Sequence, residues 1–156
     1  MFPPQFLVIE RIGTGVDVVS KKRLLQTLAD LLAEGDAALS SETVLECLLD
    51  RERLGSTGLG HGIALPHSRM REVAEARCAF VQLLQGVDYD AIDGEPVDLA
   101  LALLVPEEAT ETHLQLLSAL ATMFSDEELR KRLRGVTSSA EVLTLFDAWH
   151  SPMRLP

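Results

Sequence analysis

Residues 97–105, VDLALALLV, form a run that is apolar on both faces of an extended chain. Successive side chains of a strand point to opposite faces of its sheet, so a half-exposed strand alternates between apolar and polar residues. This run lacks the alternation after Asp98, which indicates that both of its faces are covered. Its uninterrupted apolar part, Leu99 to Val105, is far shorter than the ~20 residues of a membrane helix. The run therefore predicts a buried strand between two layers.

Helical patterns stand on both sides of this strand in the sequence. The expected helices cover residues 21–34, 40–52, 112–124, 126–133 and 140–149. Ser20 is a candidate N-cap for the first of them. Capping boxes open the last two, formed by Ser125 with Glu128 and by Ser138 with Glu141. Helices of this kind bury one apolar face, so they supply the layers that the strand requires.

Further short apolar runs bounded by turn residues predict more strands. Residues 76–84 form one, and residues 6–10 form a possible second. Asp93 and Gly94 predict a tight turn before the central run. The chain shows no repeat, linker or low-complexity segment, so residues 1–156 are expected to form one domain. Helices outside such strands predict an α/β sandwich, with a central mixed β-sheet flanked by helices.

The composition limits the classes of partner. The chain has 24 acidic and 14 basic residues and a net charge of −10, which repels phosphate backbones and argues against a nucleic-acid partner. Its 47% hydrophobic content suffices for a core. Cys47 and Cys78 lie in apolar runs and are expected to be buried thiols rather than a disulfide. Residues 1–11 lack the pattern of a signal peptide, so we expect a cytoplasmic protein without membrane insertion.

The stretch RERLGSTGLGHGIALPHSR, residues 51–69, concentrates the residues that could carry chemistry. Its glycines leave backbone N–H groups unshielded and permit positive φ, so the loop could wrap an anion. We expect Ser56, Thr57 and Gly58 to bind a phosphoryl group. The alternative is an ordinary glycine-rich turn. The lysine of a nucleotide-binding loop is missing, which predicts that the protein does not itself use ATP.

His67 follows Pro66 at the end of this stretch. Residues 62–66, GIALP, are expected to be extended, because proline biases the preceding residue toward the β region. His67 would then emerge at a strand terminus and reach solvent. A neutral imidazole is a nucleophile at physiological pH if a neighbour fixes its tautomer. His67 is therefore a candidate phosphoryl acceptor, with an ordinary surface histidine as the alternative.

Arg51 and His113 are the other candidate site residues. Arg51 lies on the inward stripe of the helix over residues 40–52, where an unpartnered guanidinium is costly, so it needs an anion. That anion could be a phosphoryl group or one of the many carboxylates. His113 begins the inward stripe of the helix over residues 112–124 and faces the protein. It could serve the site or be a core-edge histidine bonded to the backbone.

A second histidine, His61, raises the question of a metal site with His67. In an extended segment six residues span ~20 Å, which is too far for both side chains to bind one ion. The sequence therefore predicts no metal, and no cofactor.

The stretch over residues 51–69 closely resembles the active-site signature of phosphotransferase-system enzyme IIA domains of the fructose and mannitol class, which includes the nitrogen-related enzyme IIA. The likeness continues through DAIDGEPVDLALALLVPEE and ETHLQLLSALA and covers roughly residues 20–147. It implies that His67 accepts a phosphoryl group, that His113 lies beside it and that Arg51 assists. It also implies a mixed sheet between helices. One departure is His61, at a place where the family usually has asparagine; another is the poorly matched segment before residue 20.

Residues 20–23, SKKR, followed by leucines, resemble the start of the nitrogen-related branch. That branch implies a phosphorylation switch, which receives phosphate from a histidine phosphocarrier protein and binds regulatory target proteins of nitrogen and potassium physiology. The alternative is a sugar-specific enzyme IIA that passes phosphate to an enzyme IIB of a transporter. A binding module without phosphotransfer is disfavoured by the three site residues. A hydrolase or metal enzyme is disfavoured because the chain lacks a nucleophile triad or a ligand cluster.

Overall fold

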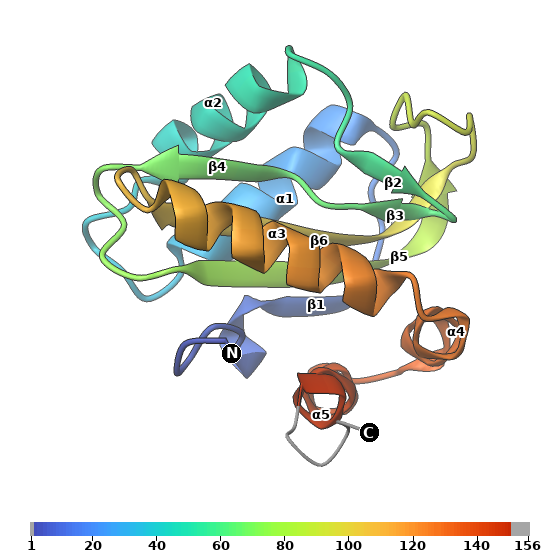
Figure 1. Cartoon of the computed structure of the whole chain (residues 1–156). Helices are drawn as coiled ribbons and strands as arrows, with labels where there is room; N and C mark the ends of the chain where they lie inside the picture. Colours follow the sequence, from blue (N-terminus) through green and yellow to red (C-terminus); the bar gives the residue numbers. More distant parts are fainter. Residues whose placement is uncertain (1, 151–156) are drawn as a thin grey trace.

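A mixed six-stranded sheet lies between helices in the computed structural model, which describes residues 2–150 (Figure 1). The strands are β1 (Ile12–Val16), β2 (Gly58–Gly60), β3 (Ile63–Ala64), β4 (His67–Met70), β5 (Arg77–Val87) and β6 (Val97–Pro106). The helices are α1 (Lys21–Ala33), α2 (Ser41–Glu52), α3 (Thr110–Phe124), α4 (Glu127–Gly135) and α5 (Ser139–His150). The strand order is β1-β5-β6-β3-β2, and β4 also pairs with β6. This architecture confirms the predicted α/β sandwich with a mixed sheet.

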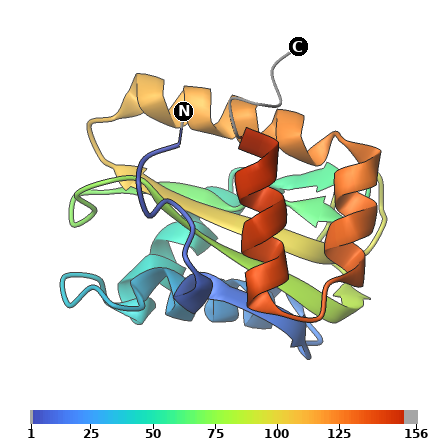
Figure 2. The ribbon, with the colours of Figure 1, turned by 90° about the horizontal axis from the view of Figure 1, so that it is seen from below.

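Strand β6 lies at the centre of the molecule and accounts for the apolar run over residues 97–105. Its odd-numbered residues from Leu99 to Val105 pack into the core beneath α3, α4 and α5. Its even-numbered residues from Ala100 to Leu104 pack into a second core beneath α1 and α2. Figure 2 shows the sheet between α3 on one side and α1 and α2 on the other. Alternation therefore buries every residue from Leu99 to Val105, as predicted for a strand covered on both sides.

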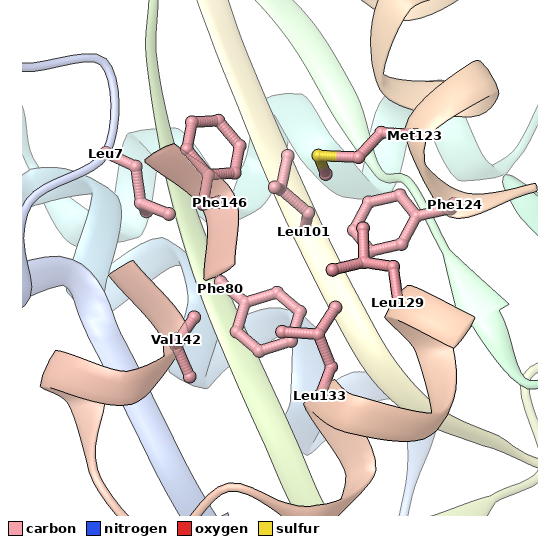
Figure 3. Close-up of a pocket in the computed structure, with 9 residues that line it drawn as sticks. All are labelled: Leu7, Phe80, Leu101, Met123, Phe124, Leu129, Leu133, Val142 and Phe146. Carbon is pink, nitrogen blue, oxygen red and sulfur yellow. The ribbon is translucent and has the colours of Figure 1, made fainter. Parts of the chain in front are cut away.

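The core beneath α3, α4 and α5 is closely packed. Leu101 and Phe80 from the sheet meet Met123, Phe124 and Phe146 from the helices (Figure 3). These and neighbouring apolar side chains enclose a cavity of about 10 Å³. That volume is about the minimum for a single water molecule, and an apolar lining offers such a water no partner. The core therefore fixes α3 rigidly on the sheet.

The N-terminal strand does not lie where the sequence pattern placed it. The possible strand over residues 6–10 is wrong: Ile9–Arg11 is a 3₁₀ turn, and β1 follows it. Arg11 holds this turn by donating hydrogen bonds from Nε to the carbonyl oxygen of Cys78 at 2.9 Å and from Nη2 to that of Phe6 at 3.2 Å. Strand β1, IGTGV, contains two glycines and so lacks the run of branched side chains that marks a strand.

The helix starts follow the predicted caps with one exception. Ser20 caps α1 by accepting a hydrogen bond from the N–H of Arg23 at 3.2 Å. At the start of α5, Oγ of Ser138 accepts a hydrogen bond from the N–H of Glu141 as predicted, while the carboxylate of Glu141 accepts from the N–H of Thr137. At α4 the predicted Ser125 is wrong, because Asp126 caps the helix instead. Within residues 2–150, no helix has both the length and the apolar character needed to cross a membrane.

Candidate functional site

Three elements from different layers meet at one groove. Strand β4 contributes His67, the last turn of α2 contributes Arg51, and the first turns of α3 contribute His113. In Figure 1, β4 lies between α2 and α3. All three side chains line a groove of about 730 Å³. The structure therefore brings together the three residues that the sequence singled out one by one.

Pro66 places His67 at a break in the sheet rather than at the end of it. Strands β3 and β4 both run parallel to β6, where Ala64 pairs with Ala100 and His67 pairs with Leu103. Between the two strands, the carbonyl oxygen of Pro66 accepts a hydrogen bond from the N–H of Leu103 at 2.9 Å. His67 thus begins a strand, which corrects the expectation that it follows the end of one. Proline has no N–H to donate, so Pro66 interrupts the strand between β3 and β4. This interruption turns the side chain of His67 toward the groove.

The hydrogen bonds of His67 define its tautomer. Its Nδ1 lies 2.8 Å from the carbonyl oxygen of Leu65. A carbonyl oxygen only accepts hydrogen bonds, so Nδ1 carries the proton. Nε2 then holds the lone pair, and it accepts a hydrogen bond from Nε of Arg51 at 3.2 Å. The nucleophilic nitrogen of His67 is therefore Nε2, on the groove side of the ring.

Arg51 is oriented by two hydrogen bonds. Besides donating to His67, it donates from Nη1 to the carbonyl oxygen of Gly55 at 2.9 Å. Burial lowers the pKa of His67 below its usual 6.5, and the positive charge of Arg51 lowers it further, against the opposing effect of the Leu65 carbonyl. His67 is therefore neutral at pH 7 and available as a nucleophile. The partners of Arg51 are an imidazole and a carbonyl, which does not support the salt-bridge alternative.

His113 stands with its ring edge-on to His67. The ring centroids lie 5.2 Å apart and the rings are inclined by 70°. Nε2 of His113 is buried and has no hydrogen-bond partner among the described residues. Burial, reinforced by the charges of His67, Arg69 and Arg51, lowers the pKa of His113 to about 4. A buried ring nitrogen without a partner costs free energy, and a ligand in the groove could remove that cost.

Arg69 is a cation of the groove that sequence reasoning missed. It lies two residues after His67 on β4, so both side chains project from the same face of the strand. Its Nη1 donates a hydrogen bond to Oγ1 of Thr110 at 2.8 Å, which ties β4 to the start of α3. Alternate residues of a strand share one face, and the spacing of two residues from His67 was the signal that could have identified Arg69.

The remaining wall of the groove is mixed in character. It is formed by Cys47, Asp50, Leu54, Ser68, Glu107, Leu114 and Leu117. Leu54 and Leu114 are apolar side chains with 83% and 64% exposure, so the rim offers apolar contacts to a partner surface. Cys78 is buried as expected, whereas Cys47 is only half-buried because it faces the groove.

The glycine-rich loop lies beside the site but directs its donors elsewhere. The N–H and Oγ1 of Thr57 both donate to the carboxylate of Glu52. The N–H of Gly58 donates to Oγ of Ser56 at 3.1 Å, and that hydroxyl lies 3.3 Å from the carbonyl oxygen of Tyr89. Ser56, Thr57 and Gly58 therefore meet one another and the protein interior. Their role in phosphoryl binding stays a prediction that these contacts do not support.

His61 lies away from the groove, in the turn between β2 and β3. It has a positive φ of 57°, and its N–H donates to Oδ2 of Asp93 at 3.1 Å. Asparagine tolerates this left-handed conformation better than most residues, which accounts for the asparagine usual in the family. The replacement of the usual asparagine by His61 thus affects a turn and not the groove that contains His67. Within the described part of the chain, no three side chains are grouped to hold a metal ion.

Comparison with known proteins identifies the family of this fold and site. The family model for "Phosphoenolpyruvate-dependent sugar phosphotransferase system, EIIA 2" matches residues 5–149. The chain belongs to this family, the type-2 enzyme IIA components of the phosphotransferase system.

Within the family, the chain is similar to nitrogen regulatory proteins. It is 46% identical over 135 residues to the nitrogen regulatory protein of Pseudomonas aeruginosa, covering 86% of this chain and 88% of that protein. The nitrogen regulatory protein IIA-Ntr from Neisseria meningitidis superimposes with a TM-score of 0.85 at 45% identity, covering 90% of this chain and 96% of that one. Enzyme IIA mannitol from Escherichia coli, in its complex with phosphorylated enzyme IIB, superimposes with a TM-score of 0.76 at 27% identity over 91% of this chain and 97% of that one.

Proposed function

We propose that the chain accepts a phosphoryl group on Nε2 of His67 from a histidine phosphocarrier protein. The observation that carries the proposal is the fixed tautomer of His67, with Nδ1 on the Leu65 carbonyl and the lone pair of Nε2 on the groove side. In the transfer, the bond between phosphorus and the donor imidazole breaks while a bond from phosphorus to Nε2 forms. The donor nitrogen keeps the electron pair of the broken bond, so the step needs no further reactant.

Arg51 and His113 act on the charge of the transferred group. Phosphoryl transfer spreads charge over the equatorial oxygens, so a nearby cation and an N–H donor stabilise the transition state without joining the covalent chemistry. Arg51 releases Nε2 of His67 and turns its N–H groups to the phosphoryl oxygens. His113 is neutral, and its buried Nε2 has no hydrogen-bond partner among the described residues, so a phosphoryl oxygen bound next to it would supply one.

The phosphorylation state then controls binding to regulatory target proteins. This part of the proposal is supported by the 46% identity to a nitrogen regulatory protein, against 27% to the mannitol enzyme IIA. The second candidate is a sugar-specific enzyme IIA that passes the group to an enzyme IIB, by analogy with the mannitol enzyme IIA that forms a complex with phosphorylated enzyme IIB. We place the protein in the cytoplasm, because two unpaired cysteines suit a reducing compartment.

Phosphorylation in a reconstituted system tests the acceptor. The protein is incubated with phosphoenolpyruvate, enzyme I and the phosphocarrier, and the acid-labile group is mapped by intact mass and peptide analysis. We expect one phosphoryl group on the wild type and on the control His61→Ala, and none on His67→Ala. Label that persists in His67→Ala contradicts the proposal, and so does label acquired from ATP with no other protein present.

A second experiment separates the regulatory function from the sugar-transport function. The phosphorylated protein is mixed with an enzyme IIB of the mannitol or fructose class, and loss of label is followed in time. A regulator keeps its phosphoryl group, whereas a sugar-specific enzyme IIA loses it to enzyme IIB. Affinity capture with wild-type protein and with His67→Ala then shows which targets depend on the phosphorylation state.

A further inference from the structure

Glu52, the residue after Arg51, is the centre of a buried polar cluster behind the site. Its side chain is only 5% exposed, and its Oε2 forms an ion pair with Nζ of Lys21 at 2.9 Å. Its Oε1 accepts a hydrogen bond from the hydroxyl of Tyr89 at 3.0 Å. The N–H of Thr57 lies 3.3 Å from both carboxylate oxygens, and Oγ1 of Thr57 also donates to Oε1. A buried carboxylate with this many partners is fully satisfied.

The cluster joins segments that are distant in the sequence. Lys21 begins α1, Glu52 ends α2, Thr57 lies in the glycine-rich loop, and Tyr89 follows β5. Nζ of Lys21 also lies 4.4 Å from the centroid of the Tyr89 ring. Burial and the negative charge of Glu52 raise the pKa of Tyr89, so its hydroxyl stays protonated and donates. The cluster therefore ties the end of α2 to α1, to the glycine-rich loop and to the segment after β5.

Arg51 depends on the two parts of the chain that this cluster holds. Its backbone belongs to the last turn of α2, next to Glu52, and helix ends fray unless they are tied down. Its Nη1 donates to the carbonyl oxygen of Gly55, which lies two residues before Thr57. The carboxylate of Glu52 thus anchors both the helical turn that carries Arg51 and the loop that accepts its hydrogen bond. Neither anchor is hydrogen-bonded to His67, although the negative charge of Glu52 acts on His67 at a distance and opposes the lowering of its pKa.

We propose that Glu52 is a positioning residue, which acts with Lys21, Thr57 and Tyr89 to keep the guanidinium of Arg51 beside His67, within reach of the phosphoryl oxygens. The proposal rests on the proposed phosphoryl transfer at His67 and adds the part of the protein that orients its cation. It assigns a role to Thr57 and Tyr89 through Arg51 rather than through contact with phosphate. A displacement of about 1 Å at such a group is enough to slow a reaction by up to about 10²-fold.

A double-mutant cycle tests whether the cluster acts through Arg51. Glu52→Gln leaves Lys21 without its buried partner and endangers folding, so the cycle uses Tyr89→Phe and Thr57→Val, each alone and combined with Arg51→Ala. Phosphoryl exchange with the phosphocarrier is measured by rapid quench. We expect each single variant to slow exchange by about 10-fold, and to have less than about a twofold effect once Arg51 is already removed. Thr57→Ser, which keeps the hydroxyl, is expected to restore the rate.

The control is Glu46→Gln, a conservative change at an exposed position of α2 outside the cluster, which is expected to exchange at the wild-type rate. A loss of equal size in both backgrounds overturns the proposal, because it shows an effect on folding or docking that is independent of Arg51. Wild-type exchange in both Tyr89→Phe and Thr57→Val overturns it as well.

A second readout needs no phosphoryl transfer at all. In the unphosphorylated protein, the N–H of Arg51 Nε is bonded to His67, so its ¹H–¹⁵N NMR signal is protected from exchange with water. We expect Tyr89→Phe and Thr57→Val to lose this protection and Glu46→Gln to keep it. Unchanged protection in both cluster variants overturns the positioning role. If instead wild-type His67 takes no phosphoryl group while the NMR result holds, it is the proposed function that fails.

Discussion

The ring of His113 meets the ring of His67 edge to face, with 5.2 Å between the centroids. One imidazole belongs to α3 and the other to β4, and Nε2 of His67 accepts a hydrogen bond from Arg51. Burial lowers the pKa of both rings, and each added positive charge lowers it further. At neutral pH both rings are therefore uncharged, as the proposed transfer to His67 requires.

The tautomer of His67 is the first property that can be tested. Because Nδ1 donates to the carbonyl of Leu65, we expect ¹⁵N NMR to show a protonated Nδ1 and an unprotonated Nε2 in the free protein. Phosphorylation is expected to shift the Nε2 resonance by forming a bond at that atom. A phosphoryl group found on Nδ1 would contradict the assignment, since that nitrogen faces the protein.

Arg51 and His113 are predicted to matter for rate rather than for folding. We expect Arg51→Ala and His113→Ala to slow phosphoryl exchange with the phosphocarrier by about 10²-fold, the scale of losing one oriented donor. Their thermal unfolding at pH 7.5 should be roughly unchanged, because Nε2 of His113 has no partner to lose among the described residues and the two hydrogen bonds of Arg51 are exposed or only partly buried. Rapid-quench exchange and thermal unfolding, measured on the same samples, check both statements.

If Arg51 and His113 have purely structural roles, we expect their removal to lower stability and not the rate. A buried ion pair or a core histidine, when truncated, costs stability and leaves the rate per folded molecule near that of the wild type. Wild-type exchange in both variants would therefore mean that Arg51 and His113 are core residues and not parts of the site.

The lowered pKa of His113 predicts how stability depends on pH. Above about pH 6.5 the ring is neutral in both folded and unfolded protein, and its contribution does not change. Between pH 6.5 and about 4 the unfolded ring takes up a proton and the folded ring does not, so stability falls as the pH falls. A shift of one pKa unit corresponds to about 1.4 kcal/mol of stability, and the partial solvent exposure of His113 reduces this contribution. We therefore expect the free energy of unfolding to fall by an amount on the order of 2 kcal/mol over this pH range.

Urea unfolding of the wild type and of His113→Ala at pH 7.5 and pH 4.5 checks this prediction. Other groups, His67 among them, also titrate in this range, so the difference between the two proteins is the relevant quantity. The wild type should lose more stability than the variant on acidification. Equal losses would show that the ring of His113 is as easily protonated in the folded protein as in the unfolded one.

Arg69 is predicted to help through its charge. An exposed charge interaction contributes about 0.2–1 kcal/mol, so Arg69→Ala should slow exchange by at most about fivefold, and by less at high salt. Arg71→Ala is the matched control: Arg71 is 87% exposed, pairs with Glu107 at 3.7 Å and does not line the groove. If both variants slow exchange equally, the effect comes from net charge and not from the place of Arg69 beside the histidines.

Much of this fold could be predicted because the periodicity of apolar residues is a local signal. The two-sided burial of residues 97–105 and the leucine stripes of α1 and α2 follow from spacing alone. Strand β1 was missed because its two glycines carry no side chains to show a pattern, and Phe6 and Leu7 pack in the core without forming a strand. The cap of α4 was misplaced by one residue, since Ser125 and Asp126 are both good N-caps and the end of α3 takes the serine.

Three members of the candidate site were predictable, but Arg69 and the contacts of the glycine-rich loop were not. His67, Arg51 and His113 carry recognisable types and positions, and the family signature groups them. No local pattern indicates that Thr57 turns inward to Glu52, because that choice depends on Tyr89, which is 32 residues away. The buried carboxylate of Glu52 accepts hydrogen bonds from Thr57 that could otherwise go to an anion. The burial of this carboxylate depends on the folded structure and cannot be inferred from a local pattern.

The placement of β4 has a consequence for the solubility of the protein. Among residues 2–150, β4 pairs only with β6, so its other edge has no partner strand. An open strand edge can recruit a strand from another molecule unless charge or proline blocks it. Here Pro66 stands before the first residue of β4, and the charged Arg69 is exposed within it. The residues beside His67 therefore also limit pairing at this edge, and apolar substitutions at them are expected to promote aggregation even where the fold itself is unharmed.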